Sequence, residues 1–340
     1  MREGERLPVD DDGALLSEAE RDALARWDED DLGVHMARRY YVDDASKVAI
    51  AKAFGVSRFQ VARLVADARR RGAVKVEVVT PGRVDRDLCA ELQQALGVPR
   101  AVVVEVEAAP GPASPAPAVA RVAAATAEVL RGVLREGDVL GMTWSRAIEA
   151  MSHQLDRLPR CTVVQLAGAV HPGDGVLGSV EVVRRVAAAA GSHGRVLYAP
   201  LVVGDAATAA GLRQQDEIAS ALVLGDRLDV AVLSVGAWGP SRSAVFDLLD
   251  ARTQQEATDA GACGEVSGRL FDADGAAVST SLDARVVGLT AEQLVRAPQR
   301  VATSHGAYRA EATRAAVRAG FATTLVVDGD LARAVLQLPP

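Results

Sequence analysis

Three short segments of the chain combine residue types that could bind an anion or the hydroxyl groups of a sugar. Residues 141–146 (GMTWSR) supply hydroxyl groups and an arginine, and residues 264–275 (GEVSGRLFDADG) are rich in glycine and carboxylates. Residues 304–309 (SHGAYR) contain a histidine and a second arginine. We interpret all three as strand-to-helix junctions. Because backbone N–H groups at a helix N-terminus bind phosphate, these junctions form a candidate ligand site.

Each of these segments also has a structural interpretation that requires no ligand. Ser145 is a suitable helix N-cap, and a lone histidine such as His305 more often has a structural role. The run Asp272–Gly275 (DADG) is too short for a calcium loop, which needs further oxygen ligands and a distal glutamate. A β-turn is favoured there, and we predict no metal site and no cofactor.

A fourth segment, residues 55–72 (GVSRFQVARLVADARRRG), has the pattern of a turn followed by a basic helix. Gly55 is suited to the left-handed conformation that ends a helix, and Ser57 to the N-cap of the next helix. Together with Ile50 and Phe54 on the preceding helix, the pattern predicts a helix-turn-helix. The second helix has apolar residues at i, i+3, i+4 and i+7, which predict one buried stripe: Val61, Leu64, Val65 and Ala68.

The polar face of this segment suits DNA, because arginine can bridge guanine O6 and N7 and glutamine can bridge adenine N6 and N7. The alternative is an amphipathic surface helix with a solvated charged face. The run VKVEVV at 74–79 is consistent with a strand, which would make the module winged. The residues expected to contact double-stranded DNA are Lys47, Ser57, Arg58, Phe59, Gln60, Arg63 and Arg70.

Charge is distributed very unevenly along the chain. The 340 residues have a formal net charge of −7, yet residues 32–75 alone carry +7, residues 1–31 carry −8 and residues 76–340 carry −6. One basic module between acidic neighbours favours a polyanionic partner for that module alone. We predict an acidic leader over 1–31, either disordered or one short helix, a DNA-binding domain over 32–80, and an effector-binding and oligomerisation domain over 84–340.

Composition excludes several classes of protein. Hydrophobic residues make up 49% of the chain, enough for a core, and no apolar run approaches the length of a membrane-spanning helix. The N-terminus lacks the apolar stretch of a signal peptide. Cys89, Cys161 and Cys263 lie far apart with no C-x-x-C pair, which indicates free thiols in the cytoplasm.

The larger region alternates short apolar runs with helical patterns, which predicts an α/β domain with a doubly wound, mostly parallel sheet. In such sheets ligands bind at the carboxyl ends of the strands. Predicted helices include 118–135, 178–190 and 308–319. The predicted strands are 101–106, 139–143, 161–166, 195–198, 229–235, 285–288, 300–303 and 323–327.

Several motifs in one order make the chain resemble the SorC family of bacterial transcriptional regulators. They begin with the helix-turn-helix segment and continue through GDVLGMTWSRAI, TVVQLAGAV, DVAVLSVGAWG, GEVSGRLFDADG and SHGAYRAEATRAAVRAG. The resemblance runs from about residue 33 to the end. It implies an effector domain related to ribose-5-phosphate isomerase and glucosamine-6-phosphate deaminase, a sugar or sugar-phosphate effector, and a homo-oligomer, dimeric or tetrameric.

The resemblance also implies an effector site at the junctions described above. This chain departs from the family, which usually has asparagine at Ala167, aspartate at Glu265, a glycine pair at His305-Gly306 and lysine at Arg309. An arginine keeps the positive charge of lysine but changes its hydrogen-bonding geometry. The effector-binding residues implied are Gly141, Thr143, Trp144, Ser145, Arg146, Gln165, Gly168, Glu265, His305, Gly306 and Arg309.

The lysines weigh against an enzyme. Lys47, Lys52 and Lys75 are the only three, so residues 76–340 cannot form a Schiff base, which requires an amine. Glu265, Asp272 or His305 could still act as a base in isomerase chemistry. We therefore expect a regulator of carbohydrate metabolism that is not an enzyme. A ligand-independent DNA-binding scaffold and a sugar-phosphate isomerase-like enzyme remain the alternatives.

Overall fold

The computed structural model describes residues 26–41, 43, 45–73, 84–105, 116–170 and 177–339. The chain forms two compact units, Met1–Val78 and Val79–Pro340. Most of the predicted leader and the predicted strand at 74–79 lie outside the described residues. Within the described residues, no helix is both long and apolar enough to cross a membrane.

The described part of the first unit contains the helices α2 (Glu29–Tyr41), α3 (Lys47–Phe54) and α4 (Arg58–Arg70). Gly55 ends α3 with a φ of 67°, and the Ser57 hydroxyl caps α4 by accepting the N–H of Gln60 at 3.2 Å. Both predictions are confirmed. The predicted apolar stripe of α4 is also confirmed, since all four of its residues are buried: Val61, Leu64, Val65 and Ala68. They pack in one cluster with Met36, Ile50 and Phe54.

Helices α2 and α4 pack closely at Gly33. A Cβ atom at this position would lie 3.1 Å from the backbone carbonyl oxygen of Leu64, closer than most such contacts. Helix α2 begins at Glu29, within the segment 1–31 that composition assigned to the acidic leader. The last acidic residues of that segment therefore belong to a helix that packs on α4.

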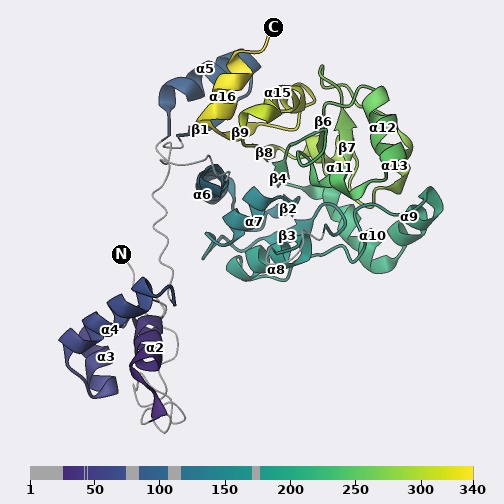
Figure 1. Cartoon of the computed structure of the whole chain (residues 1–340). Coiled ribbons are helices and arrows are strands. Elements are labelled where there is room, and N and C mark those ends of the chain that lie inside the picture. Colours follow the sequence, from purple (N-terminus) through teal and green to yellow (C-terminus); the bar gives the residue numbers. More distant parts are fainter. Residues whose placement is uncertain are drawn as a thin grey trace. The chain divides into compact units, whose positions relative to one another are not determined.

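The second unit is built on a six-stranded sheet in which every pair of neighbours is parallel. The strand order is β1-β9-β8-β4-β2-β3 (Figure 1). A second, antiparallel sheet has the order β5-β6-β7. The strands are β1 (Arg100–Val104), β2 (Val139–Met142), β3 (Thr162–Gln165), β4 (Val230–Ser234), β5 (Gly236–Ala237), β6 (Gly264–Val266), β7 (Arg269–Phe271), β8 (Gln299–Thr303) and β9 (Thr324–Asp328).

Successive side chains of a strand point to opposite faces of the large sheet, and both faces are covered by apolar clusters. On β4, Ala231 and Leu233 pack into one apolar cluster, while Val230 and Val232 pack into another. Helices α5 (Arg86–Leu96), α14 (Ala291–Arg296), α15 (Ala310–Arg318) and α16 (Gly329–Leu336) contribute to the first cluster. Helices α6 (Ala116–Val133), α7 (Arg146–Ser152) and α8 (Ser179–Ala189) contribute to the second. Although α5 and α16 are far apart in the sequence, they lie side by side (Figure 1). The predicted α/β class with a parallel sheet is confirmed.

The helices of the second unit connect these strands and flank the small sheet. Two of them, η2 and η3, are short 3₁₀ turns. They are α5 (Arg86–Leu96), α6 (Ala116–Val133), α7 (Arg146–Ser152), α8 (Ser179–Ala189), α9 (Ala206–Arg213), α10 (Asp216–Val223), η2 (Leu224–Arg227), α11 (Ala244–Leu248), α12 (Ala251–Asp259), α13 (Ser281–Arg285), α14 (Ala291–Arg296), η3 (Ala307–Arg309), α15 (Ala310–Arg318) and α16 (Gly329–Leu336).

Two predicted strands are wrong. Residues 195–198 and 285–288 make only isolated bridges, such as Val164 with Arg195 and Ala167 with Gly288. The capping box of Thr280 and Asp283 draws Arg285 into α13 instead. These segments have strand-like composition, but a continuous ladder needs a partner in register over several residues.

The segment 264–275 is not a strand-to-helix junction. It is a hairpin in which β6 and β7 pair through two turn residues, Ser267 and Gly268, with φ values of 52° and 80°. Positive φ at both positions is typical of a type I′ turn, and the Ser-Gly dipeptide was the available signal for it. The predicted β-turn at Asp272–Gly275 is confirmed by the Gly275 N–H, which donates to the Asp272 carbonyl at 3.1 Å.

Gly168 is packed against backbone where the chain leaves β3. A Cβ there would lie 2.3 Å from the carbonyl oxygen of Pro200, and a backbone atom cannot move away as a side chain can. We expect Gly168→Ala to lower the free energy of unfolding of the second unit by roughly 2 kcal/mol or more, measured by chemical denaturation. The matched control is Gly132→Ala in α6, where a Cβ meets nothing within 4 Å and helix propensity favours alanine. Equal stability of the two variants would contradict this assignment.

Candidate functional site

The parallel sheet places the carboxyl ends of its strands at one edge, which is where most of the predicted effector residues lie. From β2 the chain continues to β3 on one side, whereas from β4 it continues to β8 and β9 on the other. The strand order therefore reverses between β2 and β4. Ligands of open parallel sheets bind at such a reversal.

At this reversal, the hydroxyl group of Thr143 joins the two strands. It donates to the carbonyl oxygen of Val232 at 3.2 Å and accepts the N–H of Ser234 at 3.1 Å. Two residues later, the Ser145 hydroxyl accepts the N–H of Ile148 at 3.2 Å and caps α7. Both hydroxyl groups are engaged within the fold, so their first role is to position the start of α7.

The first residue of α7 is Arg146. Its side chain is exposed, and it makes no ion pair with any described residue. The guanidinium group acts electrostatically on His305, in the loop between β8 and α15. An exposed, uncompensated arginine at a helix N-terminus is available for an anionic ligand.

The loop after β8 is tied to the end of β9 by Asp328. The N–H of Gly306, a residue with a φ of 83°, donates to Asp328 Oδ2 at 2.6 Å. The other carboxylate oxygen of Asp328 accepts the N–H of Leu331 at 2.9 Å and caps α16. One buried carboxylate thus fixes both the His305-Gly306 backbone and the start of α16.

Arg309 lies at the end of the same loop. It donates to the carbonyl oxygens of His305 and Arg242, and its guanidinium carbon lies 4.5 Å from the centre of the Tyr308 ring. Its Nε–H is buried and has no hydrogen-bond partner, and the same holds for the hydroxyl oxygen of Thr303 on β8. Among the described residues only one other buried side-chain atom, on Arg314, is unsatisfied in this way.

The ionisable groups of this edge perturb one another. Burial lowers the pKa of His305 to about 4, helped by the positive charges of Arg309 and Arg146. Burial also lowers the pKa of Arg309, an effect opposed by Tyr308, Asp328 and Glu265. His305 is therefore neutral at pH 7.

Glu265 is a nearly fully buried carboxylate at the back of this cluster. Burial raises its pKa, while the N–H of Gly268, the hydroxyl of Ser243 and the charge of Arg309 lower it. The two hydrogen bonds are 3.0 Å and 2.9 Å long. The β6–β7 turn therefore positions Glu265, and Gly268 at its positive φ provides one of the two donors.

Four predicted effector residues have structural roles here. The buried Gln165 amide donates to the Ala167 carbonyl at 2.6 Å and accepts the N–H of Leu197 at 3.2 Å. The Trp144 indole donates to the Leu177 carbonyl at 2.9 Å. Gly141 and Gly168 are packed so tightly that a Cβ would overlap neighbouring atoms. The structure brings the remaining functional groups together around Arg146, Glu265, His305 and Arg309.

The sequence interpretation missed Thr303, Asp328, Arg242 and Tyr308. Asp328 had a detectable local signal, since an aspartate at the end of an apolar run followed by Gly329 is a typical helix N-cap. Its contact with Gly306 spans 22 residues and has no local signal. The described residues include no group of three His, Cys, Asp or Glu side chains placed to hold a metal ion.

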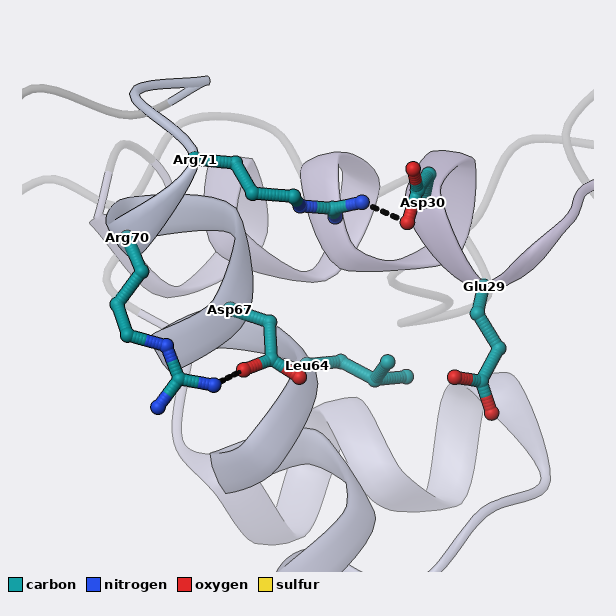
Figure 2. Close-up of a pocket in the computed structure, with 6 residues that line it drawn as sticks. All are labelled: Glu29, Asp30, Leu64, Asp67, Arg70 and Arg71. Carbon is teal, nitrogen blue, oxygen red and sulfur yellow. Dashed lines mark hydrogen bonds and ion pairs between the residues drawn. The ribbon is translucent and has the colours of Figure 1, made fainter.

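On the first unit, the residues predicted to contact DNA fall into two groups. Arg63 pairs with Glu29 at 2.9 Å, Arg70 pairs with Asp67, and the adjacent Arg71 pairs with Asp30. Figure 2 shows the pairs of Arg70 with Asp67 and of Arg71 with Asp30 beside the hollow that Glu29 and Leu64 also line.

The second group lies at the start of the helices. Arg58 places its guanidinium carbon 4.9 Å from the centre of the Phe59 ring, and Lys47 places its Nζ 5.0 Å from the centre of the Tyr40 ring. Ser57 caps α4 at the N–H of Gln60. Arg58 and Lys47 have no carboxylate partner among the described residues, so their charges are not neutralised by an ion pair there.

Comparison with known proteins shows similarity over nearly the whole chain. Residues 83–337 match a family model described as "Putative sugar-binding domain". The transcriptional regulator YjhU of Escherichia coli is 28% identical, over 91% of this chain and 96% of that protein. The transcriptional regulator LsrR of Klebsiella pneumoniae is 26% identical, over 95% of this chain and 98% of that protein. The deoxyribonucleoside regulator of Bacillus subtilis is 25% identical, over 90% of this chain and 97% of that protein.

Solved structures share the fold. The full-length sorbitol operon regulator SorC from Klebsiella pneumoniae aligns with a TM-score of 0.67 at 19% identity, covering 90% of this chain and 98% of that one. A DeoR family transcriptional regulator from Listeria monocytogenes aligns with a TM-score of 0.65 at 25% identity, covering 73% and 98%. The similarity therefore extends over most of both chains.

Because burial lowers the pKa of His305, the free energy of unfolding of this domain should depend on pH. Its folded pKa of about 4 lies below the usual 6.5, so the unfolded chain binds a proton that the folded chain does not. Stability is thus lost as the pH falls from about 6.5 towards 4. Between pH 7 and 5.5 we expect a loss of about 1 kcal/mol from this group, absent in His305→Gln. Chemical denaturation at both pH values measures it; identical pH dependence of the two proteins would contradict it.

Proposed function

Because the chain belongs to the SorC family of sugar-binding transcriptional regulators, we propose that it controls carbohydrate metabolism by binding an operator under the control of a sugar or sugar-phosphate effector. The observation that carries this proposal is the cluster at the carboxyl edge of the sheet. Arg146 and Arg309 direct two positive charges there, and the buried Arg309 Nε–H has no partner within the described chain. A ligand oxygen would supply the acceptor that this donor lacks.

In this proposal the effector's anionic or most polar group lies between Arg146 and Arg309. Glu265 is placed to accept hydrogen bonds from sugar hydroxyl groups, because a buried carboxylate keeps acceptor capacity beyond its two internal donors. His305, neutral at pH 7, offers a ring nitrogen in place of the family's glycine. The domain would resemble ribose-5-phosphate isomerase in fold while acting as a receptor.

The first unit is proposed to be the DNA-binding module, a helix-turn-helix formed by α3 and α4 within residues 32–80. Arg58 and Gln60 at the start of α4 would read base edges, while Lys47, Arg63 and Arg70 would contact phosphates. Residues 84–340 would bind the effector and form a dimer or tetramer. Paired modules would then occupy successive major grooves of a palindromic operator.

Effector and operator are coupled through the packing of the large domains. Each must alter the affinity of the other by the same factor, because binding free energies around a closed cycle add to zero. A ligand-independent scaffold would show no such coupling. An isomerase-like enzyme would turn over its ligand, with the buried Glu265 as a candidate base.

The effector proposal predicts a ligand that depends on Arg146. In a thermal-shift screen of sugars, polyols and their phosphates, we expect a compound that raises the melting temperature of the wild-type chain. Arg146→Ala should remove this shift, whereas Arg185→Ala, another exposed arginine, should keep it. If no compound shifts the wild type, the scaffold is favoured; if a hit is consumed, the enzyme is favoured.

The DNA proposal predicts that specificity depends on α4. Arg58→Ala combined with Gln60→Ala should reduce binding to a duplex selected by the full-length chain to the level of unrelated DNA, because each good base contact contributes about 1–3 kcal/mol. Arg38→Ala on α2 removes one exposed charge and should leave the preference for the selected duplex intact. Fluorescence anisotropy measures both. Retained sequence preference in the double variant would refute the assignment of α4.

A further inference from the structure

Phe59, the second residue of α4, leaves a large apolar surface exposed at the start of this helix. Its side chain is 73% exposed, whereas Phe54, Phe271 and Phe321 are buried. An aromatic ring is among the side chains that gain most from leaving water. The described part of the chain therefore leaves this surface available to a partner.

The environment of Phe59 narrows the chemistry of that partner. The Arg58 guanidinium carbon lies 4.9 Å from the ring centre, within the range of a cation–π interaction, so the ring holds the arginine in place. Arg58 has no carboxylate partner in the described chain, unlike Arg63 on the same helix. An apolar face joined to an uncompensated cation fits a polyanion that also presents an apolar group.

We propose that Phe59 is a specificity-determining residue that contacts the C5-methyl group of thymine in the major groove, while Arg58, held on its ring, reaches an adjacent guanine. This inference rests on the proposed DNA-binding function of α4. The thymine methyl is the apolar group that the major groove presents, and arginine bridges guanine O6 and N7. Neither a phosphate nor a sugar hydroxyl group would be matched by the exposed ring.

The location of the ring on the helix supports the same assignment. Ser57 caps α4, so residues 58–60 occupy its first turn, the part of a recognition helix that reaches base edges. Val61 and Leu64 on the opposite face are buried against α2 and α3, which fixes the direction in which Phe59 projects. The neighbouring Gln60 would then contact the same step or the next one.

The test removes one methyl group from the DNA. A duplex selected by the full-length chain from a random library is resynthesised with deoxyuridine in place of each thymine in turn, a change that deletes only the C5-methyl. At one position in each half-site we expect binding to weaken roughly fourfold, the loss for one buried methyl group. Phe59→Ala should weaken binding to the unmodified duplex and should no longer distinguish thymine from deoxyuridine.

Two further variants keep the test decisive. Phe59→Leu retains an apolar side chain and should retain part of the discrimination between thymine and deoxyuridine. Val48→Ala removes an exposed apolar group from α3 and should retain all of that discrimination.

The inference would be overturned by full discrimination between thymine and deoxyuridine in Phe59→Ala, or by none at any position in the wild type. Either result would leave operator binding itself intact. If Phe59→Ala changed only the oligomeric state in sedimentation, the ring would instead be a subunit contact. If the wild type selected no duplex, the proposed DNA-binding function would fail.

Discussion

A parallel sheet buried on both faces can present polar groups only at the ends of its strands, and the second unit depends on this constraint. Residues along β4 alternate between two apolar clusters, which leaves no position on the strand for a functional side chain. Functional groups are therefore found at the last residues of β8 and β9 and in the loops after β2 and β8. Parallel strands bring these segments to one edge even though the end of β2 lies more than 150 residues before the end of β8. The small β5–β6–β7 sheet adds Glu265 from a separate direction.

Most hydrogen-bonding groups at this edge are used to hold the loops in place. Thr143 joins β2 to β4, Asp328 joins the β8 loop to α16, and the β6–β7 turn holds Glu265. The groups left unsatisfied or uncompensated are cationic or neutral donors, chiefly on Arg146 and Arg309. At this edge Asp328 accepts two backbone N–H groups and Glu265 accepts one, whereas Arg146 has no ion pair and the Arg309 Nε–H has no acceptor among the described residues. An anionic effector would therefore meet local positive charge here although the domain as a whole is negatively charged.

The sequence predicted the larger features well because they depend on local patterns. Helix caps, the buried stripe of α4 and the long apolar strands are determined by residues within one or two turns of one another. The prediction failed where the determinant lies far away in the chain. Residues 285–288 have strand composition but no continuous partner, and β5 and β6 are two and three residues long and pair across some thirty residues. Likewise, the family resemblance implied ligand contacts for Gln165 and Ser145, and only their partners show that the fold already engages them.

The ion pairs of α4 have a consequence for how steeply DNA binding would respond to salt. Glu29, Asp30 and Asp67 neutralise Arg63, Arg71 and Arg70, so these arginines already have counterions supplied by the protein. When such an arginine moves to a phosphate, it releases a carboxylate as well as a cation from the DNA, and that carboxylate then attracts cations from solution. The net number of ions released is smaller than the number of phosphates contacted. The chain would thus keep its affinity over a wider range of ionic strength than its count of basic residues indicates.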